Sequence, residues 1–239
     1  MKRLFISVVI AALNEEKNIK PLVERLLEVL GKKYDYELIF PVAGTDKTAG
    51  LLKSFKNKKI KILYSRNPRG IGLDFKKGFE AVSGKADYVI TMDADLNHQP
   101  EEIPRLLKFA NAYDIVIGSR HVKGSITTSI PFFKRMISNF TNMIFNMVSD
   151  IDIHDKTSGF RLYRRDVLST IAKEYARKDF TFLTEILYIS RKHDFRIKEV
   201  PITFIYRVAG KSKFNFVKVG AAYSLFLWKT LVKRLFKDA

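Results

Sequence analysis

The stretch ADYVITMDAD, residues 86–95, contains the pattern that decides the fold. Its first eight residues form a short apolar run with β-branched and aromatic side chains, which is typical of a buried strand in a parallel sheet. The run ends at Asp93, and Asp95 follows after one intervening residue. Because side chains alternate along a strand, both carboxylates are expected to leave the strand end on the same side. The stretch therefore predicts a buried strand with two acids at its carboxyl end.

Strands and helices are expected to alternate around this stretch. Short apolar runs predict strands, and apolar residues at helical spacing predict helices. The expected strands are 4–12, 36–42, 60–65, 86–93 and 113–119, and the expected helices are 18–30, 72–82 and 100–112, with a short one after Asp46. Beyond residue 120 we expect a long amphipathic helix, a turn at glycine, two helices, a strand and a terminal helix. The alternation predicts an α/β fold with a mostly parallel sheet and helices on both faces.

Asp93 and Asp95 are candidate metal ligands. Such sheets bind ligands beyond the carboxyl ends of their strands, which is where this pair falls. Carboxylate oxygens suit a hard divalent cation such as Mg²⁺ or Mn²⁺. Substrate phosphates often complete a Mg²⁺ site, so a cation here could neutralise a departing diphosphate. The alternative is a solvated acidic turn that caps the helix from Pro100, because a lone Asp-x-Asp pair is common.

Composition limits the classes of function. The chain has 239 residues and 46% hydrophobic content, which suits one α/β domain with short appendages. It has no cysteine, so disulfides and thiolate metal sites are excluded. The net charge of +18 favours polyanionic partners: nucleic acid, anionic lipid or phosphorylated substrates. The sequence has no recognised DNA- or RNA-reading motif, so a nucleic-acid-binding module is the weaker alternative and no nucleic acid partner is expected.

Several motifs follow one another across nearly the whole chain. They are AALNE (11–15), GIGLDFKKGFEAVSGKADYVITMDADLNHQPEEIP (70–104), IVIGSRHVKG (115–124), DKTSGFRLYRRDVL (155–168) and EVPITFIYRVAGKSK (199–213). In this order they resemble the inverting family 2 glycosyltransferases of the polyprenyl- and dolichyl-phosphate mannose synthase type. The resemblance implies a Rossmann-like GT-A fold, a Mg²⁺ or Mn²⁺ cofactor, a nucleotide-sugar donor and a polyprenyl phosphate acceptor. It implies GDP-mannose as the first candidate donor and UDP-glucose as the second.

The resemblance also assigns roles by matching position. Asp93 and Asp95 would hold the metal with help from Asn97, and Arg120 would reach the diphosphate or the acceptor phosphate. Asp93, Asp95 and Arg120 form the expected catalytic set. Glu15 would contact the nucleotide or its ribose. The expected donor-binding set is Ala11, Leu13, Glu15, Phe40, Val42, Asp93, Ala94, Asp95, Arg120, Arg207 and Lys213, of which the last two would close over the donor.

Some positions depart from the family pattern. The family's acidic pair before a Gly-Ser turn falls here on Pro41 and Val42, and its Glu before Ser-Lys is Lys211. AALNE lacks the family's Pro and Tyr at positions 11 and 13. The second acid of the pair usually helps to read the base, and the side chain of Val42 cannot accept a hydrogen bond. The identity of the nucleotide base therefore stays open.

Lys134, Arg135 and Ser138 are candidate ligands of the acceptor phosphate, together with Arg120. A phosphate needs charged donors and a hydroxyl, which PFFKRMIS (131–138) supplies. By resemblance, Lys134 occupies the position of a family Arg that grips the lipid phosphate, and Ser138 matches a family Ser. The alternative is a basic surface edge without a ligand.

The acceptor decides whether the chemistry needs a general base. A phosphate is already largely anionic at neutral pH, so positioning and charge neutralisation should suffice. A sugar or glycolipid hydroxyl, the alternative acceptor, would need a base. Asp155 and Glu185 are the candidates for that role, although a turn-capping Asp and a helix carboxylate are the favoured interpretations.

Two segments are expected to form amphipathic helices at the membrane surface. They lie at about 129–151 and in the basic carboxyl-terminal part, 214–239, and the glycosyltransferase domain is expected to span 1–213. An apolar side in the acyl boundary and cations on anionic headgroups suit a bilayer surface, whereas covering the sheet is the alternative. No run approaches 18 uncharged apolar residues, so no transmembrane helix is expected. We expect a peripheral protein on the cytoplasmic face of the membrane.

Overall fold

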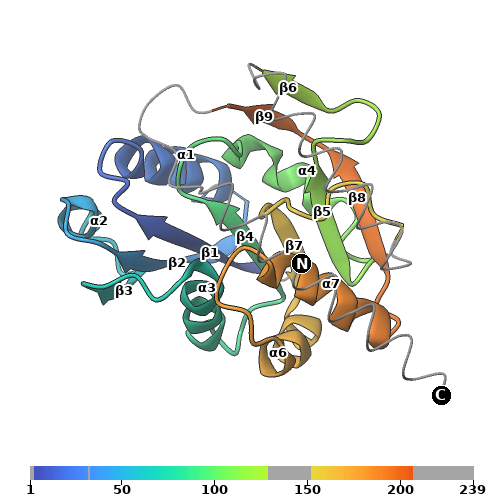
Figure 1. Ribbon diagram of the computed structural model, residues 1–239. Helices are drawn as coiled ribbons and strands as arrows, with labels where there is room; N and C mark the ends of the chain where they lie inside the picture. The colour runs from blue at the N-terminus through green and yellow to red at the C-terminus, as the bar shows by residue number, and fades with distance from the viewer. Residues whose placement is uncertain (1–2, 32, 129–151, 207–239) are drawn as a thin grey trace.

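The computed structural model describes residues 3–31, 33–128 and 152–206. They form a seven-stranded sheet in the order β3-β2-β1-β4-β7-β5-β8 and a two-stranded sheet of β6 and β9 (Figure 1). The strands are β1 (Phe5–Leu13), β2 (Asp35–Ala43), β3 (Ile60–Ser65), β4 (Tyr88–Asp93), β5 (Ile115–Ser119), β6 (Ile126–Thr128), β7 (Arg161–Arg164), β8 (Ile197–Pro201) and β9 (Thr203–Ile205). The helices are α1 (Ile19–Gly31), α2 (Thr48–Ser54), α3 (Ile71–Glu80), the 3₁₀ turn η1 (Pro100–Glu102), α4 (Ile103–Leu107), α6 (Arg165–Glu174) and α7 (Phe182–Lys192).

The large sheet is mostly parallel, as the sequence predicts. Strands β3, β2, β1 and β4 run parallel to one another, and β5 runs parallel to β8. Strand β7 lies between β4 and β5 and is antiparallel to both. This strand is not among those expected from the sequence. Because it runs the opposite way, the loop that precedes it reaches the same edge of the sheet as the carboxyl ends of β4 and β5.

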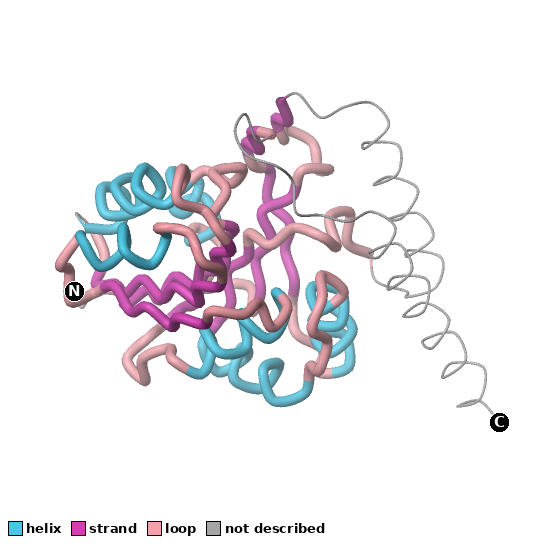
Figure 2. Tube along the Cα trace, turned by 60° about the vertical axis from the view of Figure 1, so that its left-hand side comes forward, coloured by secondary structure: helices cyan, strands magenta, loops and turns pink. Residues whose placement is uncertain are grey.

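Helices cover both faces of the sheet, with α1, α2 and α4 on one face and α3, α6 and α7 on the other (Figures 1 and 2). Alternation along β1 divides its side chains between two apolar cores. Val8 and Ile10 belong to the core beneath α1, and Val9 belongs to the core beneath α3. The amphipathic face of α1 is buried as its spacing predicts.

The predicted helix 100–112 is shorter in the structure, where η1 leads into α4 and α4 ends at Leu107. Beyond it the backbone tightens into i→i+3 hydrogen bonds, from Phe109 N to the Leu106 carbonyl and from Ala110 N to the Leu107 carbonyl. Such bonds are common where an α-helix ends, and they account for the shortened element.

Pro41 interrupts the ladder between β1 and β2. The pairing stops after Val9–Ile39 and resumes at Ala12–Val42 in the same register, because proline has no N–H to donate. The Pro41 ring lies under α3 at Gly78, where an added Cβ would meet the Pro41 Cγ at 3.0 Å. The position where the family carries an acid is thus filled by an apolar ring that packs against a helix.

The amphipathic helices predicted over 129–151 and 214–239 lie outside the described residues, so the domain division that depends on them stays a prediction. Within 3–31, 33–128 and 152–206, no helix is long and apolar enough to cross a membrane.

Candidate active site

The expected catalytic residues lie at one edge of the large sheet. Asp93 ends β4 and is paired in register with Ala11 of β1. Arg120 directly follows β5, which runs parallel to β8. The loop 155–160 enters β7 between these two strand ends. The predicted edge therefore contains carboxylates from β4 and a guanidinium from β5, with this loop between them.

Asp93 lies against the backbone of Gly159. A Cβ added at Gly159 would meet Asp93 Oδ1 at 3.2 Å, so only glycine leaves the carboxylate its present position. The loop is held there because the Thr91 hydroxyl donates to the Gly159 carbonyl oxygen at 2.7 Å. The Asp93 side chain stays 36% exposed, which leaves it accessible to a ligand.

Asp95 and Asn97 form a tight turn after the strand. The Asn97 backbone N–H donates to Asp95 Oδ1 at 3.2 Å, and its side-chain Nδ2 donates to Asp95 Oδ2 at 2.8 Å. Leu96 between them has a φ of 64°, in the left-handed region. Asn97 Oδ1 is buried and has no hydrogen-bond partner among the described residues. Among all the residues that the structure describes, no group of three or more His, Cys, Asp or Glu side chains could hold a metal.

His98 fills the space behind the acidic pair. Its ring stacks on Phe160 and meets Phe204 edge-on, with both centroid distances 5.4 Å. Nδ1 lies 3.4 Å from the backbone nitrogen of Asp93 and 3.5 Å from Asp93 Oδ2. Burial lowers the pKa of His98 to about 4, so the ring is neutral at physiological pH. No role was expected for His98 from the sequence, although it directly follows Asn97.

Arg120 is held by Asp155 in a bidentate ion pair. Its Nε donates to Asp155 Oδ2 at 2.7 Å, and an Nη donates to Oδ1 at 2.6 Å. The same Nη also donates to the hydroxyl of Thr157 at 2.7 Å. Burial alone would raise the pKa of Asp155, but the Arg120 guanidinium outweighs burial and holds that pKa well below its usual range. Asp155 is thus ionised at physiological pH.

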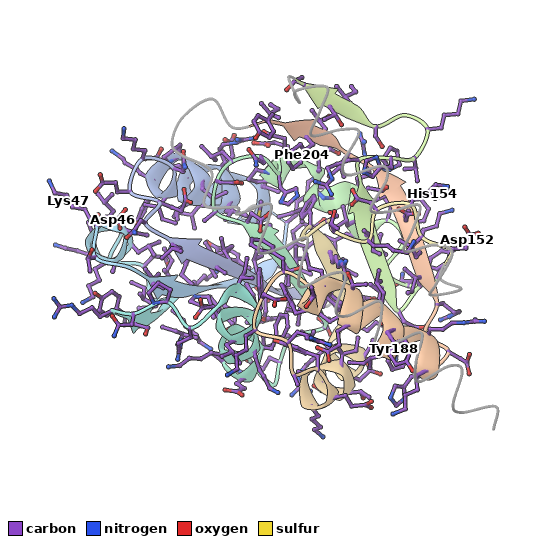
Figure 3. The ribbon with its side chains drawn as sticks, in the orientation of Figure 1. Asp46, Lys47, Asp152, His154, Tyr188 and Phe204 are labelled. Atoms are coloured by element: carbon purple, nitrogen blue, oxygen red, sulfur yellow. The ribbon has the colours of Figure 1, made fainter. Side chains whose placement is uncertain are left out.

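Two further contacts fix this pair. Glu199 of β8 accepts the backbone N–H of His154 and that of Asp155, each at 2.8 Å. Phe204 of β9 lies under the guanidinium, 5.1 Å from the Arg120 Cζ to the ring centroid. Figure 3 shows His154 beside β8 and Phe204 on β9. The pair therefore connects β5, β8 and β9.

Arg161 fastens the loop 155–160 from the sheet side. Its side chain is fully buried, and three of its nitrogens donate to the carbonyl oxygens of Ser158, Leu183 and Lys156, each at 2.8 Å. The Ser158 hydroxyl in turn donates to the Gly118 carbonyl of β5 at 2.6 Å. These bonds make the loop a fixed part of the site.

The sequence model described as "Glycosyl transferase family 2" matches residues 7–172. The chain belongs to this family. It is 32% identical over 241 residues to a "Dolichol-phosphate mannosyltransferase" of Pyrococcus furiosus, covering 97% of this chain and 66% of that protein. It therefore spans just under two thirds of the length of that relative. An "Undecaprenyl-phosphate mannosyltransferase" of Micrococcus luteus is 33% identical over 172 residues, which is 71% of each protein.

Solved structures confirm the predicted GT-A fold of this family 2 chain. The glucosyl-3-phosphoglycerate synthase of Mycobacterium tuberculosis, in complex with Mn²⁺, UDP and glucosyl-3-phosphoglycerate, matches with a TM-score of 0.70. The match covers 97% of this chain and 80% of that one, at 19% sequence identity. The same enzyme with Mg²⁺ and UDP gives a TM-score of 0.68 at 19% identity, covering 97% of this chain and 79% of that one. At this identity the likeness concerns the fold.

The two carboxylates named as general bases both have structural partners in this family 2 chain. Asp155 forms the ion pair with Arg120. Glu185 accepts the backbone N–H of Ala176 at 3.0 Å and that of Arg177 at 2.9 Å through one oxygen. The favoured interpretations, a carboxylate in a turn and one on a helix, agree with these contacts.

The donor-side residues divide into two groups. Glu15 lies just after β1, where its carboxylate accepts a hydrogen bond from the Asn18 side-chain Nδ2 at 2.7 Å. Ala11 and Leu13 are half-buried at the same strand end. The side chains of Phe40, Val42 and Ala94 are 0%, 2% and 3% exposed and belong to the core beneath α1. These three side chains do not face the site, so a contact with donor would have to use their backbone.

The turn that follows β2, just after the positions of the family acids, is built by side-chain oxygens that accept backbone N–H groups. The Asn14 side-chain oxygen accepts the N–H of Thr45 at 3.0 Å and that of Asp46 at 3.3 Å. Asp46 accepts the Glu16 N–H at 3.0 Å. Figure 3 shows Asp46 beside α2, on the opposite side of the molecule from His154. The expected residues Lys134, Arg135, Ser138, Arg207 and Lys213 lie outside the described residues, so their roles stay predictions.

Proposed function

We propose that this chain transfers a hexose, mannose first, from a nucleotide-diphosphate sugar to a polyprenyl or dolichyl phosphate, with inversion at the anomeric carbon. One observation carries the proposal: Asp155, the base candidate at the sheet edge, is committed to Arg120 and therefore cannot serve a hydroxyl acceptor. A phosphate acceptor needs no such base, because it is already anionic at neutral pH. The names of the two mannosyltransferase relatives support the same acceptor class.

A divalent cation fits the acidic turn. Asp93 and Asp95 offer carboxylate oxygens, and the buried Asn97 Oδ1 has no other partner among the described residues. An all-oxygen set suits Mg²⁺ or Mn²⁺. We propose these three residues as the ligands, with substrate oxygens and water completing the shell. A bound cation there supplies charge neutralisation for the departing diphosphate.

The chain's own residues position the two phosphates. Arg120 is a planar and permanently charged group that Asp155 and Thr157 hold in one orientation, which suits a phosphate better than a flexible ammonium group does. Glu15 is proposed to contact the ribose or nucleotide, and Ala11 and Leu13 to line the donor cleft. Lys134, Arg135 and Ser138 are proposed to bind the acceptor phosphate, with Arg207 and Lys213 over the donor. Catalysis then consists of alignment and electrostatic stabilisation.

The donor and the location complete the proposal. GDP-mannose is the first candidate donor and UDP-glucose the second, as the resemblance implies, while Pro41 and Val42 offer no side-chain acceptor to read the base. The amphipathic segment 129–151 and the basic segment 214–239 are proposed to contact an anionic membrane surface, where each cation contributes about 1 kcal/mol. Peripheral association at the cytoplasmic face follows from that contact.

The decisive experiment is a transfer assay in detergent with Mn²⁺. GDP-mannose and UDP-glucose are each supplied with dolichyl phosphate, and parallel reactions contain a free sugar or a glycolipid. Sugar is expected on the lipid phosphate, and Asp93→Asn should abolish the transfer. A folded protein that modifies only the hydroxyl acceptors, or none, would overturn the proposal. A thermal-shift panel of GDP-, UDP- and CDP-sugars with and without Mn²⁺ identifies the donor independently.

A further inference from the structure

We propose that Asp155 and Glu199 are positioning residues, which hold Arg120 in the orientation that contacts a substrate phosphate. The inference rests on the proposed function, because it takes Arg120 as the phosphate-binding group. It assigns a role to two carboxylates outside the predicted catalytic set and removes Asp155 from consideration as a base.

Asp155 holds the guanidinium by its edge. Its two oxygens accept Nε and an Nη of Arg120, and Oδ2 also accepts the Arg120 backbone N–H at 2.9 Å. Its side chain is 0% exposed, whereas that of Arg120 remains 18% exposed. A general base must face the proton that it removes. Here the carboxylate faces the arginine, and the arginine is the member of the pair that reaches solvent.

Glu199 holds the backbone from which Asp155 extends. One of its oxygens accepts the Asp155 N–H, and the other accepts the His154 N–H and lies 2.9 Å from the His154 ring nitrogen. Glu199 is paired with Ile117 of β5, three residues before Arg120. Arg120 follows β5, and Glu199 of β8 holds the backbone of Asp155. Because β5 and β8 are paired, the sheet sets the separation between Arg120 and Asp155.

Phe204 and Thr157 limit the remaining rotation of the guanidinium. Phe204 lies under its face, and the Thr157 hydroxyl accepts the Nη that also binds Asp155. Phe204 also touches the His98 ring, which backs Asp93. The orientation of Arg120 is thus fixed before substrate binds. Contacts through Phe204 and His98 connect Arg120 to Asp93. Such preorganisation is what a site that transfers a sugar to a phosphate needs, because misplacement by about 1 Å costs on the order of 10²-fold in rate.

The test is a double-mutant cycle on kcat/KM for lipid transfer, with Asp155→Asn, Arg120→Ala and the double variant. Each single variant is expected to lose on the order of 10²-fold. If Asp155 acts only through Arg120, the double variant should be no slower than Arg120→Ala. If Asp155 acts independently, the losses should multiply to about 10⁴-fold, which overturns the inference. The pH profile of Asp155→Asn should keep the wild-type shape, whereas loss of an acidic limb would indicate a base.

Two milder variants keep the test valid if Asp155→Asn folds poorly. Thr157→Val removes one acceptor of Arg120, and Glu199→Gln removes one of the two carboxylate oxygens under the loop. Both should lower kcat/KM by about 10-fold and lose that effect in the Arg120→Ala background. The matched control is Asp166→Asn, which breaks an exposed Asp–Arg pair with Arg164 at the far end of β7 and should leave kcat/KM unchanged.

The outcomes separate the two proposals. A wild-type protein without lipid transfer contradicts the proposed function. If the wild type transfers sugar to the lipid and the Asp155→Asn and Thr157→Val variants do so equally well, only the positioning role is contradicted.

Discussion

Replacing Gly159 by alanine tests the acidic site without removing any of its oxygens. The added Cβ would lie 3.2 Å from Asp93 Oδ1 and 3.5 Å from Oδ2. Ordinary contacts begin at 3.4 Å, so the carboxylate must move by about 0.2 Å or more. Gly159 does not have a positive φ, so the substitution adds no backbone strain. The disturbance should therefore be concentrated on Asp93.

The expected effect is on metal binding and only slightly on stability. Asp93 is partly exposed and can swing away, so the free energy of unfolding should change by less than about 1 kcal/mol. Changes to residues that orient a metal ligand typically cost 10–100-fold in affinity. We expect the Mn²⁺ concentration for half-maximal transfer to rise by about 10-fold, with much of the activity restored at saturating Mn²⁺.

The assay is a Mn²⁺ titration of lipid transfer, with thermal melting in parallel. Gly50→Ala is the matched control, because no atom lies within 4 Å of its added Cβ. That variant should titrate like the wild type. An unchanged Mn²⁺ requirement for Gly159→Ala, at an unchanged melting temperature, would refute the assignment of Asp93 as a ligand. A large drop in melting temperature with an unchanged requirement would show that the loop moves and the carboxylate does not.

Further predictions concern the surroundings of the site. Gly118→Ala should destabilise the fold by about 2 kcal/mol in urea unfolding, because its Cβ would lie 2.8 Å from the Phe160 ring and 2.9 Å from Ile202. Arg161→Met should cost about 3 kcal/mol in the same assay, because three carbonyl oxygens lose their shared donor. Burial lowers the pKa of His98 from 6.5 to about 4, so the folded state keeps the ring neutral at a pH where the unfolded state protonates it. The stability is therefore fully present above pH 6.5, and the free energy of unfolding should fall by about 3 kcal/mol as the pH drops to 4. Urea midpoints in EDTA should fall over that range, and His98→Phe should flatten the dependence.

The first half of the fold could be predicted because its strands are short apolar runs, apart from 60–65, which alternates between apolar and polar residues. The expected strands 4–12 and 36–42 correspond to Phe5–Leu13 and Asp35–Ala43. Strand β7 could not be found in this way, since Arg161–Arg164 is short and begins and ends with arginine. Its first arginine is buried only because carbonyl oxygens of the loop and of α7 receive it. That contact is tertiary and has no signature in local hydropathy.

The candidate site was predictable where it depends on the parallel strands. Asp93, Asp95 and Arg120 fall at strand ends that any such sheet brings to one edge. The partner of Arg120 was not predictable as such, because Asp155 reaches it only through the reversed strand β7. For Glu199 the sequence contains only a partial indication of its role, namely a carboxylate next to Val200 within a short strand. Phe40 was assigned by matching position, although the apolar run 36–42 already indicated burial.

The reversed strand β7 also has a consequence for the order of assembly. Strands β4 and β5 are not neighbours in the sheet, because β7 separates them. A nascent chain that has reached residue 128 therefore contains both strand ends but cannot yet join them through backbone bonds. Pairings between distant segments are slow to form, since chain entropy is lost before the contacts are gained. The region around Asp93 and Arg120 should accordingly be among the last parts to become ordered, only after Arg164 has emerged from the ribosome.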